Sequence, residues 1–210
     1  TVPVMMPESY NFNQAMSDPT LNDAEAAANV TYIGGHLYGA TIRDYPLART
    51  LNKRLWMTEY LENDQTTASA MTTGRQIADC LSVGNMSAYI WWKCIGDANG
   101  LLDNSGAPKR RGYVMAQYSR FVRPGDYRVD VPTNTGVLAI CAFADAKSSR
   151  FSIVAVNNTT LPMPQTFSLQ GAKVTSVVPV ITSDTQTLEA QPATAVVDSS
   201  FDYTIPAESI

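Results

Sequence analysis

The stretch RLWMTEYLENDQTTASAMTTGRQIADCLSVGNMSAYIWW, residues 54–92, predicts a strand, a helix and a second strand in succession. Residues 54–60 and 87–92 are short apolar runs that contain aromatic residues, and both are typical of buried strands. Between them, apolar residues recur at helical spacing over residues 67–83. This order indicates a βαβ unit, and therefore a parallel sheet.

The same alternation covers the chain up to about residue 125. Further apolar runs predict strands at residues 2–6 and 31–37, and helical patterns cover residues 22–29, 47–52 and 111–121. Four strand and helix units of this kind make half of an eight-fold (β/α)8 barrel, or a small doubly wound sheet.

The sequence changes character after Arg123-Pro124-Gly125, where helical patterns end and Thr, Ser and Val become frequent. Short β-rich runs separated by turn residues predict an antiparallel β-sandwich of roughly six strands. The expected strands are residues 136–144, 151–156, 166–169, 174–181, 194–197 and 201–205. We therefore expect an α/β segment over residues 1–125, followed by an all-β segment over residues 126–210.

Composition excludes several classes of function. With 15 basic against 19 acidic residues, the net charge is −4, and no basic stripe of the kind that binds nucleic acid is present. The single histidine argues against a zinc site, which normally takes several His or Cys ligands, and the three widely spaced cysteines indicate neither a disulfide framework nor a metal knuckle. No run reaches the length that a membrane helix needs. We expect no metal, cofactor, nucleic acid or membrane partner.

Two strand ends carry the residues of greatest chemical interest. Glu59 closes an apolar strand, and an ionised Glu is costly there unless it lies at the open carboxyl end, where barrel enzymes place their catalytic groups. An ordinary solvent-facing Glu is the alternative. His36 and Tyr38 follow Gly34-Gly35 on another strand and share one side of it, although both residues are also common as hydrogen-bonded buried groups. Glu8 is a further carboxylate at a strand end.

The motifs PESYNF (7–12), SDPTLND (17–23), GGHLYG (34–39), LWMTEY (55–60), AYIWW (88–92) and KRRGYVMAQYSRFVRPG (109–125) together resemble the bacterial xylanases of glycoside hydrolase family 30. The resemblance implies the C-terminal half of a (β/α)8 barrel, strands five to eight, with an attached β-sandwich side domain. It also implies a secreted, retaining enzyme that hydrolyses the β-1,4-xylan backbone.

The resemblance assigns a role to each candidate residue. Glu59 maps to the nucleophile, Tyr38 to its hydrogen-bond donor, His36 to the lining of the cleft and Trp92 to the floor under the sugar. Glu8 and Tyr89 map to positions that face the same cleft. Substrate contacts are therefore expected from Glu8, His36, Tyr38, Tyr89 and Trp92.

The sequence departs from the family in two places. The acid/base Glu of an Asn-Glu-Pro motif does not occur in these 210 residues, so we expect a second polypeptide segment to supply the first half of the barrel. The loop after the paired tryptophans holds Lys93 where glucuronate-dependent members carry Arg, which predicts a xylanase that does not depend on glucuronic acid side chains. A noncatalytic carbohydrate-binding fragment, a structural remnant and a family hydrolase for another β-glycan are the alternatives.

Overall fold

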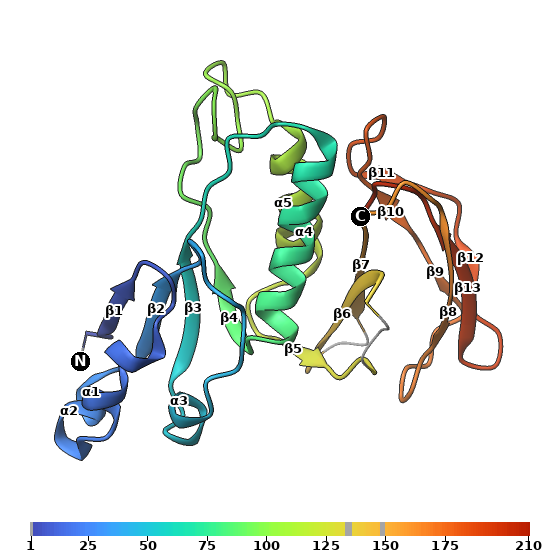
Figure 1. Ribbon diagram of the computed structural model, residues 1–210. Helices are drawn as coiled ribbons and strands as arrows, with labels where there is room; N and C mark the ends of the chain where they lie inside the picture. The colour runs from blue at the N-terminus through green and yellow to red at the C-terminus, as the bar shows by residue number, and fades with distance from the viewer. Residues whose placement is uncertain (1, 133–135, 148–149) are drawn as a thin grey trace.

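In the computed structural model, which describes residues 2–132, 136–147 and 150–210, the first four strands form one parallel sheet in the order β1-β2-β3-β4. They are β1 (Met5–Ser9), β2 (Tyr32–His36), β3 (Arg54–Glu59) and β4 (Met86–Tyr89). Each strand pairs in parallel with the next. The parallel sheet expected from the alternation of strands and helices is thus confirmed (Figure 1).

Helices connect these strands on one side of the sheet. They are a 3₁₀ turn (Gln14–Met16), α1 (Asp18–Leu21), α2 (Ala24–Asn29), α3 (Pro46–Thr50), α4 (Thr67–Ser82) and α5 (Arg110–Phe121). The alternation of side chains along β3 explains the packing: Leu55 and Met57 are buried with Cys80 of α4, whereas Trp56 and Thr58 point to the opposite face and remain partly exposed. None of the helices in the described ranges is long and apolar enough to cross a bilayer.

Several expected elements have different bounds in the structure. The strand expected at residues 2–6 lies at Met5–Ser9, and the one expected at residues 166–169 begins earlier, at Met163. The helical pattern at residues 22–29 forms only part of a pair, α1 and α2, and the strand expected at residues 87–92 ends at Tyr89. Beyond Tyr89, the amides of Ile90 and Trp92 still donate to the carbonyls of Met57 and Tyr60. Trp91 turns inward because its indole Nε1 donates to the carbonyl of Asn99, 2.7 Å away, so the regular ladder stops before the tryptophans.

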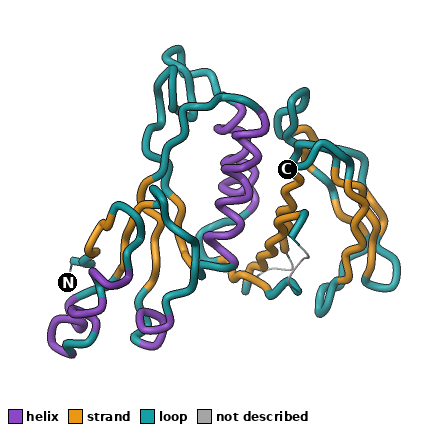
Figure 2. The backbone as a smooth tube through the Cα atoms, in the orientation of Figure 1, coloured by secondary structure: helices purple, strands orange, loops and turns teal. Residues whose placement is uncertain are grey.

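The second part of the chain begins with β5 (Asp126–Val129), β6 (Leu138–Asp145) and β7 (Phe151–Asn157), which form an antiparallel sheet. The long helices α4 and α5 stand between this sheet and the parallel one (Figures 1 and 2). A continuous buried cluster joins the helices to β6 and β7. It includes Met71, Ile77, Val114, Tyr118, Cys141, Phe143, Val154 and Val156. Helices α4 and α5 therefore share one buried cluster with the β-rich segment, while the parallel sheet packs in a second cluster that includes Ile33, Leu55 and Met57.

A second layer of strands lies beyond β7. It consists of β8 (Met163–Ser168) paired with β13 (Ser200–Ile205), β9 (Ser176–Val177) with β12 (Thr194–Ala195), and β10 (Val180–Ile181) with β11 (Glu189–Ala190). The strand expected at residues 174–181 is interrupted around Pro179, which has no amide hydrogen for a ladder. The described residues form a three-stranded sheet facing three two-stranded sheets, so the β-rich part has more and shorter strands than the roughly six expected.

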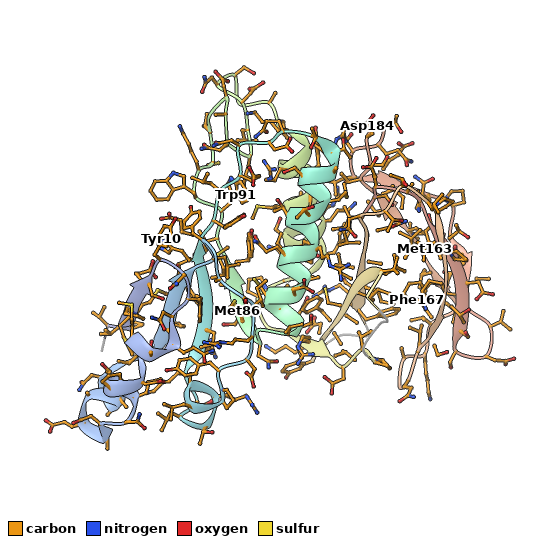
Figure 3. The ribbon with its side chains drawn as sticks, viewed as in Figure 1. Tyr10, Met86, Trp91, Met163, Phe167 and Asp184 are labelled. Atoms are coloured by element: carbon orange, nitrogen blue, oxygen red, sulfur yellow. The ribbon has the colours of Figure 1, made fainter. Side chains whose placement is uncertain are left out.

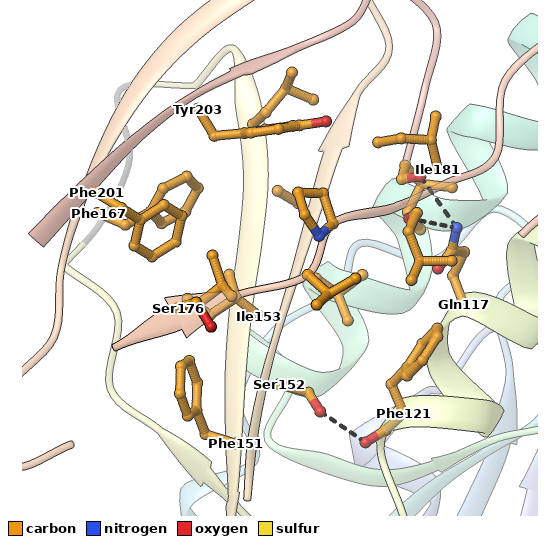
Figure 4. Close-up of a pocket in the computed structure, with 18 residues that line it drawn as sticks. Gln117, Phe121, Phe151, Ser152, Ile153, Phe167, Ser176, Ile181, Phe201 and Tyr203 are labelled. Carbon is orange, nitrogen blue, oxygen red and sulfur yellow. Dashed lines mark hydrogen bonds between the residues drawn. The ribbon is translucent and has the colours of Figure 1, made fainter. Parts of the chain in front are cut away.

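The two layers border a half-open, largely apolar pocket of about 330 Å³ (Figure 4). Stacked rings of Phe167 and Phe201, with centroids 4.8 Å apart, form one wall, and Phe151 and Phe121 lie opposite. Helix α5 lines one end of the pocket through Gln117, whose amide donates to the carbonyls of Val180 and Ile210.

Asn157 provides a test of how the last residues are held. Its fully buried amide donates to the carbonyls of Leu161 and Pro206 and accepts hydrogen bonds from Thr159. Asn157→Ala leaves these groups unpaired and should lower the free energy of unfolding by about 2–3 kcal/mol. The exposed neighbour is the control, because Asn158→Ala should change stability by less than about 0.5 kcal/mol. Urea denaturation measures both, and equal losses would contradict the prediction.

Candidate active site

The carboxyl ends of β1, β2 and β3 bring three ionisable side chains together. Glu8 comes from β1, His36 from the end of β2 and Glu59 from the end of β3, and His36 is paired with Glu59 across the two strands. Strands that run in parallel end at the same edge of the sheet, so residues far apart in sequence meet there.

His36 lies between the two carboxylates. Its Nε2 is 3.2 Å from Oε2 of Glu8, within hydrogen-bond distance, and its Nδ1 is 3.5 Å from Oε1 of Glu59. The second separation is too long for a good hydrogen bond, and Nδ1 is buried without a hydrogen-bond partner, so this contact is an ion-pair distance only.

Each carboxylate also has a hydroxyl donor. The phenol of Tyr38 donates to Oε1 of Glu59 at 3.1 Å, and the hydroxyl of Thr58 donates to Oε2 of Glu8 at 2.9 Å. Burial, and then the hydrogen bond to Glu59, raise the pKa of Tyr38 from 10.0 to about 12. Tyr38 therefore stays protonated and remains a donor to Glu59 throughout the neutral range.

Irregular backbone conformation and register set the direction of the Glu8 and His36 side chains. Glu8 has a φ of 61°, a left-handed conformation that is uncommon for a residue other than glycine, and the register of β1 with β2 shifts between Pro7 and Ser9. The register of β2 with β3 also shifts, between Gly35 and His36. Bulges of this kind re-aim a side chain and are frequent beside active sites.

Gly34 leaves the space that Glu8 occupies. A Cβ atom at this position would lie 2.2 Å from Oε1 of Glu8 and 2.6 Å from Sδ of Met5. No other residue type therefore fits without displacing the carboxylate. The pair Gly34-Gly35 is thus a requirement of the site as well as of the strand.

A row of aromatic rings borders the site. Tyr10 stacks on Tyr38 with centroids 4.9 Å apart, Tyr38 stacks on Tyr60 at 5.4 Å, and Tyr60 meets the buried Trp91 edge to face at 6.0 Å. Figure 3 shows Tyr10 and Trp91 at the same end of the parallel sheet. These contacts hold the ring of Tyr38 from both sides.

Arg111, which lies behind this row, is not among the residues predicted for the site. Its side chain is 1% exposed, and its guanidinium lies 4.9 Å from the ring centroid of Trp91. It donates to the carbonyls of Glu62 and Asp64, in the loop that follows β3, and to hydroxyls on α4. Lys109, Arg110 and Arg111 are consecutive cations at the start of a helix. The local sequence treats them alike, so it does not indicate which one is buried.

Two predicted contact residues lie apart from the carboxylates. Tyr89 is paired with Met57, so it points to the helix side of the sheet, and its hydroxyl donates to Gln76 of α4. The expectation that Tyr89 faces the same site as Glu59 is therefore not supported. Trp92 is 57% exposed in the segment after β4, and its role as a floor under a sugar stays a prediction.

Chemically, the arrangement suits a carboxylate nucleophile. Glu59 has one hydroxyl donor and a neighbouring imidazole, and its side chain is 21% exposed, so it is both oriented and accessible. Among the described residues, no group of three or more His, Cys, Asp or Glu side chains is arranged to hold a metal ion.

The space at Gly34 can be tested directly. Gly34→Ala must push the Glu8 carboxylate away from Thr58 and His36, and should lower the free energy of unfolding by about 1–3 kcal/mol, as overpacking does. Urea denaturation of the single variant and of Gly34→Ala in a Glu8→Ala background measures the effect. The cost should shrink in the double variant, because the clashing carboxylate is gone. An undiminished cost would assign the strain to Met5 instead.

Comparison with known proteins identifies relatives of this arrangement. No family model matches the chain. The chain is 33% identical to glucuronoxylanase XynC of Bacillus subtilis (strain 168) over 217 residues, covering 99% of this chain and 51% of the relative.

Two solved structures are similar over nearly the whole chain. The glycoside hydrolase family 30 subfamily 8 xylanase Xyn30A from Clostridium acetobutylicum matches with a TM-score of 0.94 and 38% identity, over 100% of this chain and 54% of that one. A GH30 endoxylanase from Clostridium papyrosolvens C71 matches with a TM-score of 0.91 and 38% identity, over 99% and 54%. The chain spans about half the length of the relatives it matches. These matches show that the chain is similar, over nearly its whole length, to about half the length of known glycoside hydrolase family 30 xylanases.

Proposed function

We propose that this chain is the nucleophile-bearing half of a retaining endo-β-1,4-xylanase. The observation that carries the proposal is the Glu59 carboxylate at the end of β3, oriented by the Tyr38 hydroxyl at 3.1 Å. The relatives named as xylanases support xylan as the substrate. Because such a polymer cannot enter a cell, we also propose that the enzyme acts outside it.

In the proposed reaction, an oxygen of Glu59 attacks the anomeric carbon of a xylose unit while the bond to the leaving oxygen breaks. A glycosyl-enzyme forms, and water then hydrolyses it with retention of configuration. The leaving oxygen must receive a proton from a second carboxylic acid about 5–5.5 Å from the nucleophile. Glu8 does not suit this role, because its Oε2 already accepts a hydrogen bond from Thr58 and lies 3.2 Å from Nε2 of His36.

A polypeptide that supplies the first half of the barrel is therefore part of the proposal. Within the described residues, β1 and β4 are the two edges of the parallel sheet, each with one hydrogen-bonded neighbour. The face opposite the helices carries large partly exposed rings, such as Tyr32 against Trp56 with centroids 4.5 Å apart. Additional strands would pair with both edges and cover this face.

A noncatalytic carbohydrate-binding fragment is the second candidate. The exposed indole of Trp92 favours it, because sugar rings stack on such surfaces. The two functions differ in what they require of Glu59, since binding alone needs no nucleophile. A family hydrolase for another β-glycan would share Glu59 and differ only in its substrate.

Glu59→Gln tests the nucleophile. In an enzyme completed by the first four barrel strands, this variant should lose at least about 10³-fold in kcat, because an amide cannot attack the anomeric carbon. Xylan binding should remain close to that of the parent, since the side chain keeps its shape. Initial rates of reducing-sugar release and affinity electrophoresis in xylan measure the two properties.

The matched control is Glu62→Gln, a carboxylate just beyond β3 whose Oε1 accepts from the amides of Asn63 and Asp64. That variant should retain turnover. Full activity of Glu59→Gln would refute the assignment, and a completed parent enzyme that binds xylan without any turnover would favour the binding fragment.

We further propose that the enzyme does not depend on glucuronic acid side chains. Close recognition of a carboxylate favours a guanidinium with free paired donors. Residues 93–106 contain no Arg, and the Lys93 side chain packs against Gly96 of its own loop. Lys109 donates to the carbonyls of Gly96 and Asp97, and Arg111 is buried with its donors engaged. Lys109 and Arg111 are thus occupied by the protein itself, which leaves the exposed Lys93, a point charge without paired donors, as the one cation of residues 93–106.

The expected result is similar rates on neutral and acidic substrates. The completed enzyme should cleave linear xylo-oligosaccharides and aldouronic acids of equal backbone length at initial rates within about tenfold of each other. A preference for the aldouronic acid beyond roughly tenfold, or about 1.4 kcal/mol, would reveal a carboxylate site on the assembled enzyme.

A further inference from the structure

The imidazole of His36 occupies an unusual position, because each of its two nitrogens faces a carboxylate oxygen. Nε2 faces Oε2 of Glu8 at 3.2 Å, and Nδ1 faces Oε1 of Glu59 at 3.5 Å. The ring is largely buried, with its side chain 18% exposed, and Nδ1 has no hydrogen-bond partner. The ring and Glu59 are thus mostly shielded from water, whereas the Glu8 carboxylate is partly exposed at 46%.

The charge state of the ring follows from what the facing atoms can do. An ionised carboxylate only accepts hydrogen bonds, whereas a neutral imidazole has one N–H donor and one nitrogen lone pair. Either neutral tautomer would therefore turn a lone pair toward a negatively charged oxygen. An imidazolium, with an N–H at both nitrogens, is the form that is attracted to both partners.

We propose that Glu8 is a positioning residue that keeps His36 as an imidazolium, so that the site carries a bridge of alternating charge from Glu8 through His36 to Glu59. The bridge orients His36 toward the proposed nucleophile Glu59. Its significance for catalysis rests on the function proposed above, whereas the bridge itself is a property of the fold.

The backbone supports Glu8 in this role. The left-handed φ of Glu8, the register shift beside it and the space left by Gly34 all serve to place its carboxylate. The Thr58 hydroxyl donates to Oε2, the same oxygen that faces His36. Strained backbone persists where the surrounding structure over-determines it, commonly at functional sites.

The groups around His36 come from three strands or the segments that follow them. Glu8 belongs to β1 and Glu59 to β3, and the ring of Tyr38 lies edge-on to His36 at 5.9 Å after β2. The pKa of Tyr38 is raised to about 12, so this phenol is uncharged where a histidine titrates. The two carboxylates are then the charges in contact with the ring.

The test is the protonation state of His36, measured by long-range ¹H–¹⁵N NMR of the ring nitrogens at neutral pH. Residues 1–210 contain a single histidine, so one ring gives the whole signal. In a longer polypeptide, subtraction of the His36→Gln spectrum isolates it. We expect both nitrogens to carry a proton. A neutral ring with one protonated nitrogen at neutral pH would overturn the proposal, and this outcome needs no variant.

Glu8→Gln then separates Glu8 from the rest of the site. Without the carboxylate, Nε2 loses its anionic partner, and the ring should become neutral with its proton on Nδ1, facing Glu59. The control is Glu189→Gln, which removes an exposed carboxylate on β11 and should leave the ring unchanged. Circular dichroism verifies that both variants fold. An imidazolium that persists in folded Glu8→Gln would overturn the role of Glu8.

Enzyme kinetics provide a second, independent test of the proposal. In the completed enzyme, Glu8→Gln should lower kcat by about tenfold with little change in KM, and should move the alkaline limb of the kcat profile to lower pH. An unchanged pH profile together with the expected NMR change would restrict the bridge to a structural role and overturn its catalytic part. If the completed enzyme has no xylanase activity, the proposed function fails. The NMR measurement still shows whether the Glu8–His36–Glu59 bridge of alternating charge exists.

Discussion

The buried guanidinium of Arg111 is the interaction on which the geometry of the site depends. Placing a charge in the interior is costly unless it is hydrogen-bonded, and burial lowers the pKa of Arg111 below its usual value. The cost is offset by donation to two carbonyls after β3 and to hydroxyls of Ser69 and Thr73 on α4. One residue of α5 thereby joins the loop that follows β3 to both long helices.

A series of aromatic rings in contact with one another connects Arg111 to Glu59. The guanidinium supports Trp91, Trp91 meets Tyr60, Tyr60 stacks on Tyr38, and Tyr38 donates to Glu59. Aromatic rings have few rotatable bonds, so a row of them holds a donor in place at low entropic cost. The carboxylate of Glu59 is thus oriented by Tyr38 and by rings that rest on the buried Arg111. His36 and Glu8 lie beside it on β2 and β1.

Helices α4 and α5 also pack against the β-rich part, which therefore supports the site from the side opposite the parallel sheet. Residues of α4 and α5 lie in one buried cluster with β6 and β7. Tyr118 extends this contact, since its hydroxyl donates to the carbonyl of Gly74 on α4. The elements that position the loop after β3 are therefore packed from both sides, by the parallel sheet and by the antiparallel one.

The sequence alone determined the order of the elements and the identity of the central site residues. Apolar periodicity predicted β3 and α4 with nearly their observed bounds, and strand-end motifs pointed to Glu59, His36, Tyr38 and Glu8, which the structure brings together. These features are local, because periodicity and the end of a strand depend only on neighbouring residues.

Only the tertiary structure decided which side of the sheet a residue takes and which cation is buried. Tyr89 lies on the helix side because β4 pairs with β3 through a register shift between Leu55 and Trp56, which no local pattern encodes. Arg111 is buried because carbonyls and hydroxyls from distant segments meet around it. The position of His36 between two carboxylates likewise depends on irregular register at β1 and β2, where one displaced residue changes the direction of every side chain that follows.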